Sequence, residues 1–243
     1  FVVFKNLSKD HFQEIRKLDG LIKLNLNFDE ILKQLNKYNE YVGFSLSVDG
    51  EGEDIQESLY NAVLWNKIEK VRSILKSKKA QIDFKPQNGE APLLHIAAGR
   101  GYDEIVKLLL VHQAPKDKID SNRRTALMTA LKHGHRKAAK ILVNQDAAID
   151  GVDSSKCSAL HYALRNKYID IATMLINKGA SVNDVDSRGF RALHYAAELK
   201  KTELITLLMG KGAKIEATES SFPVLKSVIR TTDKDFLFFF LNQ

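Results

Sequence analysis

The sequence has 243 residues, of which 44% are apolar, enough to bury a hydrophobic core of domain size. Its single cysteine, Cys157, excludes a disulfide framework, and its longest apolar run, residues 236–241, is too short to span a membrane. The formal net charge of +7 is unevenly distributed: residues 1–54 carry 7 Lys/Arg and 10 Asp/Glu, whereas residues 55–243 carry 30 and 20, a net charge of +10. A basic region after an acidic leader bears on the partners of the chain rather than on its fold.

Residues 1–54 show no repeat. Ser8 can cap a helix that runs to Leu18, and Asn27 can cap a second helix. Residues 1–4, 21–26 and 41–48 have extended patterns, and residues 49–54 form an acidic connector that contains glycine. Three interpretations stay open: a capping segment that covers the apolar end of the following array, a small independent α/β unit, and a loosely ordered leader.

From residue 55 the sequence repeats itself with a period of about 33 residues. The segments that begin at Asp120, Asp153 and Asp186 read DSNRRTAL, DSSKCSAL and DSRGFRAL, and each continues with two short amphipathic helical patterns. One leucine in each copy aligns all copies. These motif leucines define repeats 1 to 6, and positions within a repeat are counted from them: Leu59, Leu94, Leu127, Leu160, Leu193 and Leu225.

This period, together with the sequence ALHYA at residues 159–163 and 192–196, resembles the ankyrin-repeat family. The resemblance implies a mostly α fold: an ankyrin-repeat α-solenoid of helix-turn-helix units joined by β-hairpin loops over residues 55–243. It leaves the last repeat incomplete at Gln243. Residues 1–54 are then expected to form a small N-terminal α or α/β capping segment, or a small α/β unit with an acidic linker.

Within each repeat, local rules predict specific roles. Thr125 and Ser158 are expected to cap the first, inner helix, and Arg191 to lose that cap at about 1 kcal/mol. Alanine pairs at residues 97–98 and 196–197 are expected to let neighbouring inner helices approach closely. Left-handed turns are expected after the helices at Asn66, Gly101, Gly134, Gly179 and Gly212. Extra residues near 78–80 and 91–95 predict a bulged hairpin.

The histidines do not predict a metal centre. His95, His161 and His194 each follow a motif leucine, so the solenoid would distribute them along the stack, one in each repeat, whereas a metal needs converging ligands. Cys157 has no histidine placed to activate it, and residues 99–101 lack the strand and the Gly-Lys-Ser/Thr of a phosphate loop. We therefore expect no catalytic residue, no cofactor and no metal, and a protein that is not an enzyme.

By resemblance, partner contacts concentrate on the hairpin tips and on the exposed end of each inner helix. The residues at these positions form the predicted partner-binding site: Trp65, Arg100, Arg124, Lys132, His133, Arg165, Asn166, Arg188, Phe190, Glu198, Leu199 and Arg230. Arginine suits bidentate recognition of carboxylate or phosphate, and Trp65 and Phe190 are aromatic anchors. Two alternatives stay open: that the cations are only solvated, and that Trp65 packs under the N-terminal segment.

These observations favour a protein–protein interaction scaffold or adaptor that binds an acidic or extended partner segment in a basic concave groove. The alternative is a regulatory domain of a larger effector that senses a phosphorylated small molecule or oligonucleotide. Direct nucleic-acid binding is disfavoured because the basic residues are not interleaved with stacking aromatics. The expected location is intracellular and cytoplasmic, with the nucleus as the other option, without membrane insertion and with the oligomeric state left open.

Overall fold

The computed structural model describes residues 55–83 and 91–214. The chain divides into two units, residues 1–52 and 53–243, and the described residues all belong to the second unit. The predicted N-terminal segment, the sixth repeat with Arg230, the incomplete end and most of the expected bulged hairpin lie outside the described residues.

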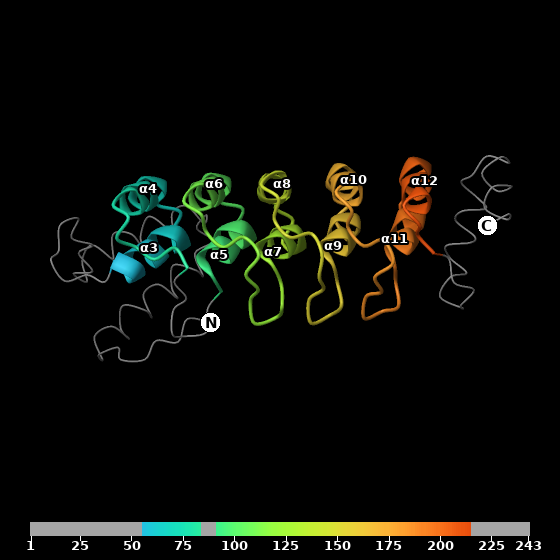
Figure 1. Ribbon diagram of the computed structural model, residues 1–243, viewed down its shortest axis with the longest axis horizontal. Helices are drawn as coiled ribbons and strands as arrows, with labels where there is room; N and C mark the ends of the chain where they lie inside the picture. The colour runs from blue at the N-terminus through green and yellow to red at the C-terminus, as the bar shows by residue number, and fades with distance from the viewer. Residues whose placement is uncertain (1–54, 84–90, 215–243) are drawn as a thin grey trace, which may run out of the picture. The chain divides into compact units, whose positions relative to one another are not determined.

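The described residues form ten α-helices in five pairs and contain no assigned strand. The inner helices are α3 (Ile55–Leu64), α5 (Leu93–Arg100), α7 (Ala126–Lys132), α9 (Ala159–Arg165) and α11 (Ala192–Glu198). The outer helices are α4 (Ile68–Lys76), α6 (Asp103–Val111), α8 (Arg136–Asn144), α10 (Ile169–Asn177) and α12 (Thr202–Gly210). Figure 1 shows the two sets as two rows, with the loops before α7, α9 and α11 extending side by side from the inner row.

Each repeat packs against the next along both rows. Inner helices contact the neighbouring inner helices in the order α3, α5, α7, α9 and α11, and outer helices contact their neighbours in the order α4, α6, α8, α10 and α12. Every inner helix also contacts the outer helix of its own pair. The predicted mostly helical solenoid is therefore confirmed, and its core is continuous between the rows.

Small residues on the inner helices and larger ones on the outer helices build this core. The predicted alanine pairs, Ala97-Ala98 and Ala196-Ala197, are at most 1% exposed, because the inner helices pack closely on both sides. The outer helices of repeats 2 and 5 bury the following aliphatic residues: Ile105, Val106, Leu109, Leu204, Ile205 and Leu208. Each such burial contributes roughly 1.5–3 kcal/mol.

The predicted left-handed turns are confirmed, and two more follow inner helices at positions where the sequence has lysine. After the inner helices, Gly101 has φ 70°, Gly134 has φ 85° and Asn66 has φ 54°. Lys167 and Lys200 occupy the same place in repeats 4 and 5, with φ 60° and 53°. A side chain in this conformation costs roughly 1–2 kcal/mol relative to glycine, so the turn geometry is imposed by the repeat and not by these residues.

The expected β-hairpins are turns held by an aspartate rather than strand ladders in the described residues. Two backbone bonds close each turn: the aspartate N–H donates to the carbonyl four residues later, and the N–H three residues later donates to the aspartate carbonyl. The aspartates are Asp120, Asp153 and Asp186. In each turn, Oδ1 of the aspartate also accepts the N–H groups two and four residues later at 2.8–2.9 Å. Adjacent loops are joined by bonds from Ser154 N to Asn122 O and from Ser187 N to Ser155 O.

The second oxygen of each aspartate takes a side-chain donor, which differs between repeats. The Tyr162 hydroxyl donates to Asp153 Oδ2 at 2.5 Å, and the Tyr195 hydroxyl donates to Asp186 Oδ2 at 2.6 Å. Repeat 3 has Thr129 at the tyrosine position. There the guanidinium of Arg124 replaces the hydroxyl, with Nε at 2.9 Å and Nη2 at 2.7 Å from Asp120 Oδ2.

The inner helices begin as predicted. The Thr125 hydroxyl accepts from Met128 N at 3.3 Å, and the Ser158 hydroxyl accepts from His161 N at 3.4 Å. Arg191 makes no such side-chain cap, but its N–H donates to His194 Nδ1 at 3.1 Å. This bond keeps half of the reciprocal cap seen at Ser158, whose N–H donates to His161 Nδ1 at 3.1 Å.

The histidines after the motif leucines join successive repeats. Nε2 of His95 donates to Arg124 O at 2.8 Å, and Nε2 of His161 donates to Phe190 O at 3.1 Å, each carbonyl lying one repeat further along the chain. Nδ1 of His95 has no hydrogen-bond partner in the described structure, because the residue before its helix is Pro92, which has no N–H. Burial lowers the pKa of both His95 and His161, so both rings are neutral when they make these bonds.

Candidate functional site

Positions +5 and +6, at the C-terminal end of each inner helix, bring together most of the predicted site residues. The fold buries the first turns of these helices and leaves their ends open, so each described repeat has at least one exposed side chain here. The exposed residues at these positions are Trp65, Arg100, Lys132, His133, Arg165 and Glu198.

Position +6 also stabilises the helix ends. Arg100 Nη1 donates to Leu64 O at 2.7 Å, and Asn166 Nδ2 donates to Leu131 O at 2.5 Å, so both side chains bind carbonyls of the preceding repeat. His133 Nδ1 lies 2.9 Å from Thr129 O in its own helix. Because the last carbonyls of a helix lack partners within it, these bonds contribute to the stack as well as exposing polar groups.

The side chains at position +5 make fewer polar contacts within the fold. Lys132 and Glu198 are exposed, and the described residues offer neither of them a hydrogen bond or an ion pair. Arg165, at the same position in repeat 4, is exposed and lies over the Tyr162 ring at 5.9 Å from its centroid, with Nη1 3.9 Å from Cys157 Sγ. These three side chains are thus accessible to a partner.

The loop before α11 holds a second accessible arginine. The guanidinium of Arg188 lies 5.1 Å from the Phe190 ring centroid and 5.6 Å from that of Tyr195, and it donates to the Tyr195 hydroxyl. Its Nε is 3.5 Å from Asp186 Oδ2, yet the side chain is 53% exposed. Burial and the Asp186 hydrogen bond raise the pKa of Tyr195 to about 12, so the hydroxyl stays protonated. Arg188 is therefore held in place with part of its guanidinium facing solvent.

Arg124 differs from the other predicted cations. Its side chain is only 14% exposed, because it completes the turn around Asp120. Burial raises the pKa of Asp120, but the hydrogen bonds from Arg124 and from the backbone outweigh this effect and lower it. The structure thus places Arg124 in an internal ion pair, away from the accessible set.

The predicted apolar site residues are exposed to different degrees. Trp65 is 63% exposed, whereas Leu199 is half-buried against the core. Phe190 is also half-buried and contacts the ring of His194 at 5.3 Å, edge to face. Trp65 is thus the large apolar group of this site with the most surface left to bury on binding.

At the loop tips and after the inner helices, sequence reasoning missed four exposed cations in left-handed turns. Arg123 and Lys156 occupy the loop-tip place that Gly189 has in repeat 5, with φ 59° and 56°. Lys167 and Lys200 follow the inner helices. These four turns could have been predicted from the sequence, because at each of the four positions another repeat has glycine.

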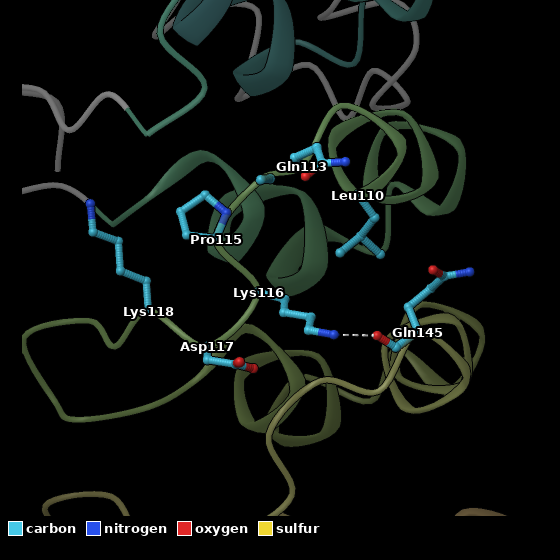
Figure 2. Close-up of a pocket in the computed structure, with 8 residues that line it drawn as sticks. Leu110, Gln113, Pro115, Lys116, Asp117, Lys118 and Gln145 are labelled. Carbon is cyan, nitrogen blue, oxygen red and sulfur yellow. Dashed lines mark hydrogen bonds between the residues drawn. The ribbon is translucent and has the colours of Figure 1, made fainter.

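A shallow hollow lies apart from these residues, where the end of α6 meets the loop after it and the end of α8 (Figure 2). Its polar side chains already serve the joints between repeats. Lys116 Nζ donates to Gln145 O at 2.8 Å, Asp117 Oδ1 accepts from Ala148 N at 2.7 Å, and Lys118 pairs with Asp83. The hollow is therefore accounted for by contacts between repeats.

The side chains that could bind a metal or act as nucleophiles lie apart from one another in the described structure. Within residues 55–83 and 91–214, no three His, Cys, Asp or Glu side chains gather as a metal site would require. Cys157 is buried, and burial followed by the charge of Asp153 raises the pKa of its thiol. No helix in these ranges is long and apolar enough to cross a membrane.

Comparison with known proteins identifies the repeat. A family model described as ankyrin repeats in three copies matches residues 59–153, 94–186 and 147–219, which together span more than half of the chain. No curated protein matches the sequence.

Proposed function

This chain belongs to the ankyrin-repeat family, and we propose that it is a scaffold that binds an acidic or extended segment of another protein. Repeats of this family generally mediate protein–protein interaction and are typically not enzymes. The proposed binding face comprises the exposed ends of the inner helices and the loop tip of repeat 5. Its principal residues are Trp65, Arg100, Lys132, Arg165 and Arg188.

The observation that carries this proposal is the pair of accessible arginines held against tyrosine rings. Arg165 lies on Tyr162 and Arg188 on Tyr195, so each guanidinium loses less freedom when a partner binds. Ordering a flexible side chain on binding costs about 0.5–1.5 kcal/mol, which this stacking reduces. A planar guanidinium is also weakly hydrated and binds carboxylates through two parallel bonds, so acidic groups are its natural partners.

Trp65 adds an apolar anchor at one end of this face. Tryptophan and arginine are enriched among the residues that contribute most to binding at protein interfaces. Trp65 precedes Arg100 at the same position one repeat along, and Arg100 binds the carbonyl of Leu64, next to Trp65 in the chain. A partner segment that reached both would bury the exposed indole beside a fixed cation. The single cysteine, which is buried, fits a reducing compartment, and we propose an intracellular, cytoplasmic location.

The test is a comparison of three forms of the chain in affinity capture with nuclease present: wild type, Lys132→Glu/Arg165→Glu, and the control Lys137→Glu/Lys211→Glu. Lys137 and Lys211 are exposed cations at the outer helices, so the control reverses two exposed charges away from the proposed face. We expect captured proteins to be lost with the first pair and kept with the control. Equal capture by all three forms would place recognition elsewhere. Loss of wild-type capture only when nuclease is added would favour nucleic acid.

A further inference from the structure

Position +5 carries charges of a definite order along three successive repeats. Lys132 ends α7, Arg165 ends α9 and Glu198 ends α11, so the column reads positive, positive, negative. All three side chains are exposed, and the described residues show no ion pair between any two of them.

This order does not stabilise the array itself. Inner helices that pack directly are about 8–10 Å apart, so neighbouring charges of the column lie about one Debye length from each other at physiological salt. Lys132 and Arg165 have the same sign and repel weakly at that distance, and Glu198 makes no ion pair with Arg165 in the described structure. The order of the three charges is better explained by binding of a partner than by folding of the chain.

The spacing of the column matches an extended polypeptide. A polyproline II segment advances about 3.1 Å per residue with three residues per turn, so every third side chain lies on the same face, about 9 Å apart, close to the separation of adjacent inner helices. A segment that runs along the stack in this extended conformation therefore presents every third side chain to position +5 of successive repeats. A β-strand would instead present every second side chain to one face, and an α-helix every seventh at a similar distance, so the three-residue spacing distinguishes these conformations.

We propose that the binding face selects an extended protein segment with the pattern acidic-x-x-acidic-x-x-basic, in either chain direction. The acidic residues pair with Lys132 and Arg165, and the basic residue pairs with Glu198. This inference rests on the proposed function and adds the partner's charge order to it. Glu198 gives specificity, because a uniformly acidic segment would place a like charge against it.

The experiment uses random peptides of about twelve residues displayed on phage, long enough in extended form to cross three repeats. They are selected on the wild-type chain, on Glu198→Lys and on the control Glu203→Lys. Glu203 is an exposed glutamate on α12, outside the column, so the control makes the same substitution without altering it. Circular dichroism confirms that both variants fold.

Wild type and Glu203→Lys are expected to enrich acidic-x-x-acidic-x-x-basic, and Glu198→Lys to enrich acidic residues at all three positions. Synthetic peptides of the two patterns are expected to differ in affinity by about tenfold, in opposite directions on wild type and Glu198→Lys. Enrichment of acidic peptides without the three-residue spacing, or without the change at Glu198→Lys, would overturn this inference and leave the proposed function standing. If no acidic peptide is enriched, both are overturned.

Discussion

Replacing Tyr162 with phenylalanine is expected to destabilise the chain more than the same change at Tyr195. Both rings are buried, at 6% and 4% exposure, so the packing change is closely matched. In repeat 4 the lost hydroxyl is the side-chain donor to Asp153 Oδ2, and Asp153 is only 5% exposed. A hydrogen bond to a charged group is worth roughly 1.5–3 kcal/mol, and that is the loss expected for Tyr162→Phe.

At Tyr195 the structure provides a substitute. Arg188 Nε lies 3.5 Å from Asp186 Oδ2, and its guanidinium can move closer once the hydroxyl is gone, as Arg124 already does at Asp120. Tyr195→Phe should therefore lose only about 1 kcal/mol, the typical net contribution of one hydrogen bond. Double replacement of Tyr195 and Arg188 should restore the larger loss.

Urea unfolding followed by circular dichroism measures both variants. Because repeat arrays can unfold in parts, amide hydrogen exchange provides a local measurement at Ser155 and Cys157, whose N–H groups bind Asp153 Oδ1. Tyr162→Phe should accelerate exchange there. Equal losses for the two tyrosine variants, or unchanged exchange at Cys157, would refute the account of these turns.

Two further predictions concern the turns and the histidines. Lys167→Gly should raise the free energy of unfolding by about 1 kcal/mol, because φ is 60° there, and a urea midpoint that does not increase would contradict the strain argument. Burial lowers the folded-state pKa of His95 and His161 from the ordinary 6.5, so the unfolded chain binds more protons just below pH 6.5. Stability is then fully present above pH 6.5 and is lost as the pH falls through the folded values. Urea midpoints should therefore be lower at pH 5.5 than at pH 7.5, and equal midpoints would contradict the argument from burial of these rings.

Much of the fold could be predicted because many of its features depend on the residue type at a single position of the repeat. The alanine pairs, the caps at Thr125 and Ser158 and the glycine turns each depend on one residue type at one position. The histidine bonds also follow from the register, since His95 and His161 bind carbonyls 29 residues further along the chain.

The role of Arg124 could not be predicted from the residues at the same position in the other repeats. At the same position, repeats 4 and 5 have Cys157 and Phe190, and only the absence of a tyrosine at Thr129 leaves Asp120 without a hydroxyl donor. The assignment therefore needs three positions of one repeat read together. Single-position rules placed Arg124 with the accessible cations, and its ion pair explains why it is only 14% exposed.

The strongest argument for the proposed binding face is the contrast between repeat positions that keep the same residue and positions that do not. The residue that holds each loop is the same in repeats 3 to 5, namely Asp120, Asp153 and Asp186. Position +5 changes from lysine to arginine to glutamate along repeats 3 to 5, whereas the buried position two residues before it stays alanine, at Ala130, Ala163 and Ala196. Since packing does not require this variation and the side chains face solvent, the residues that differ between repeats are those best suited to distinguish one partner segment from another.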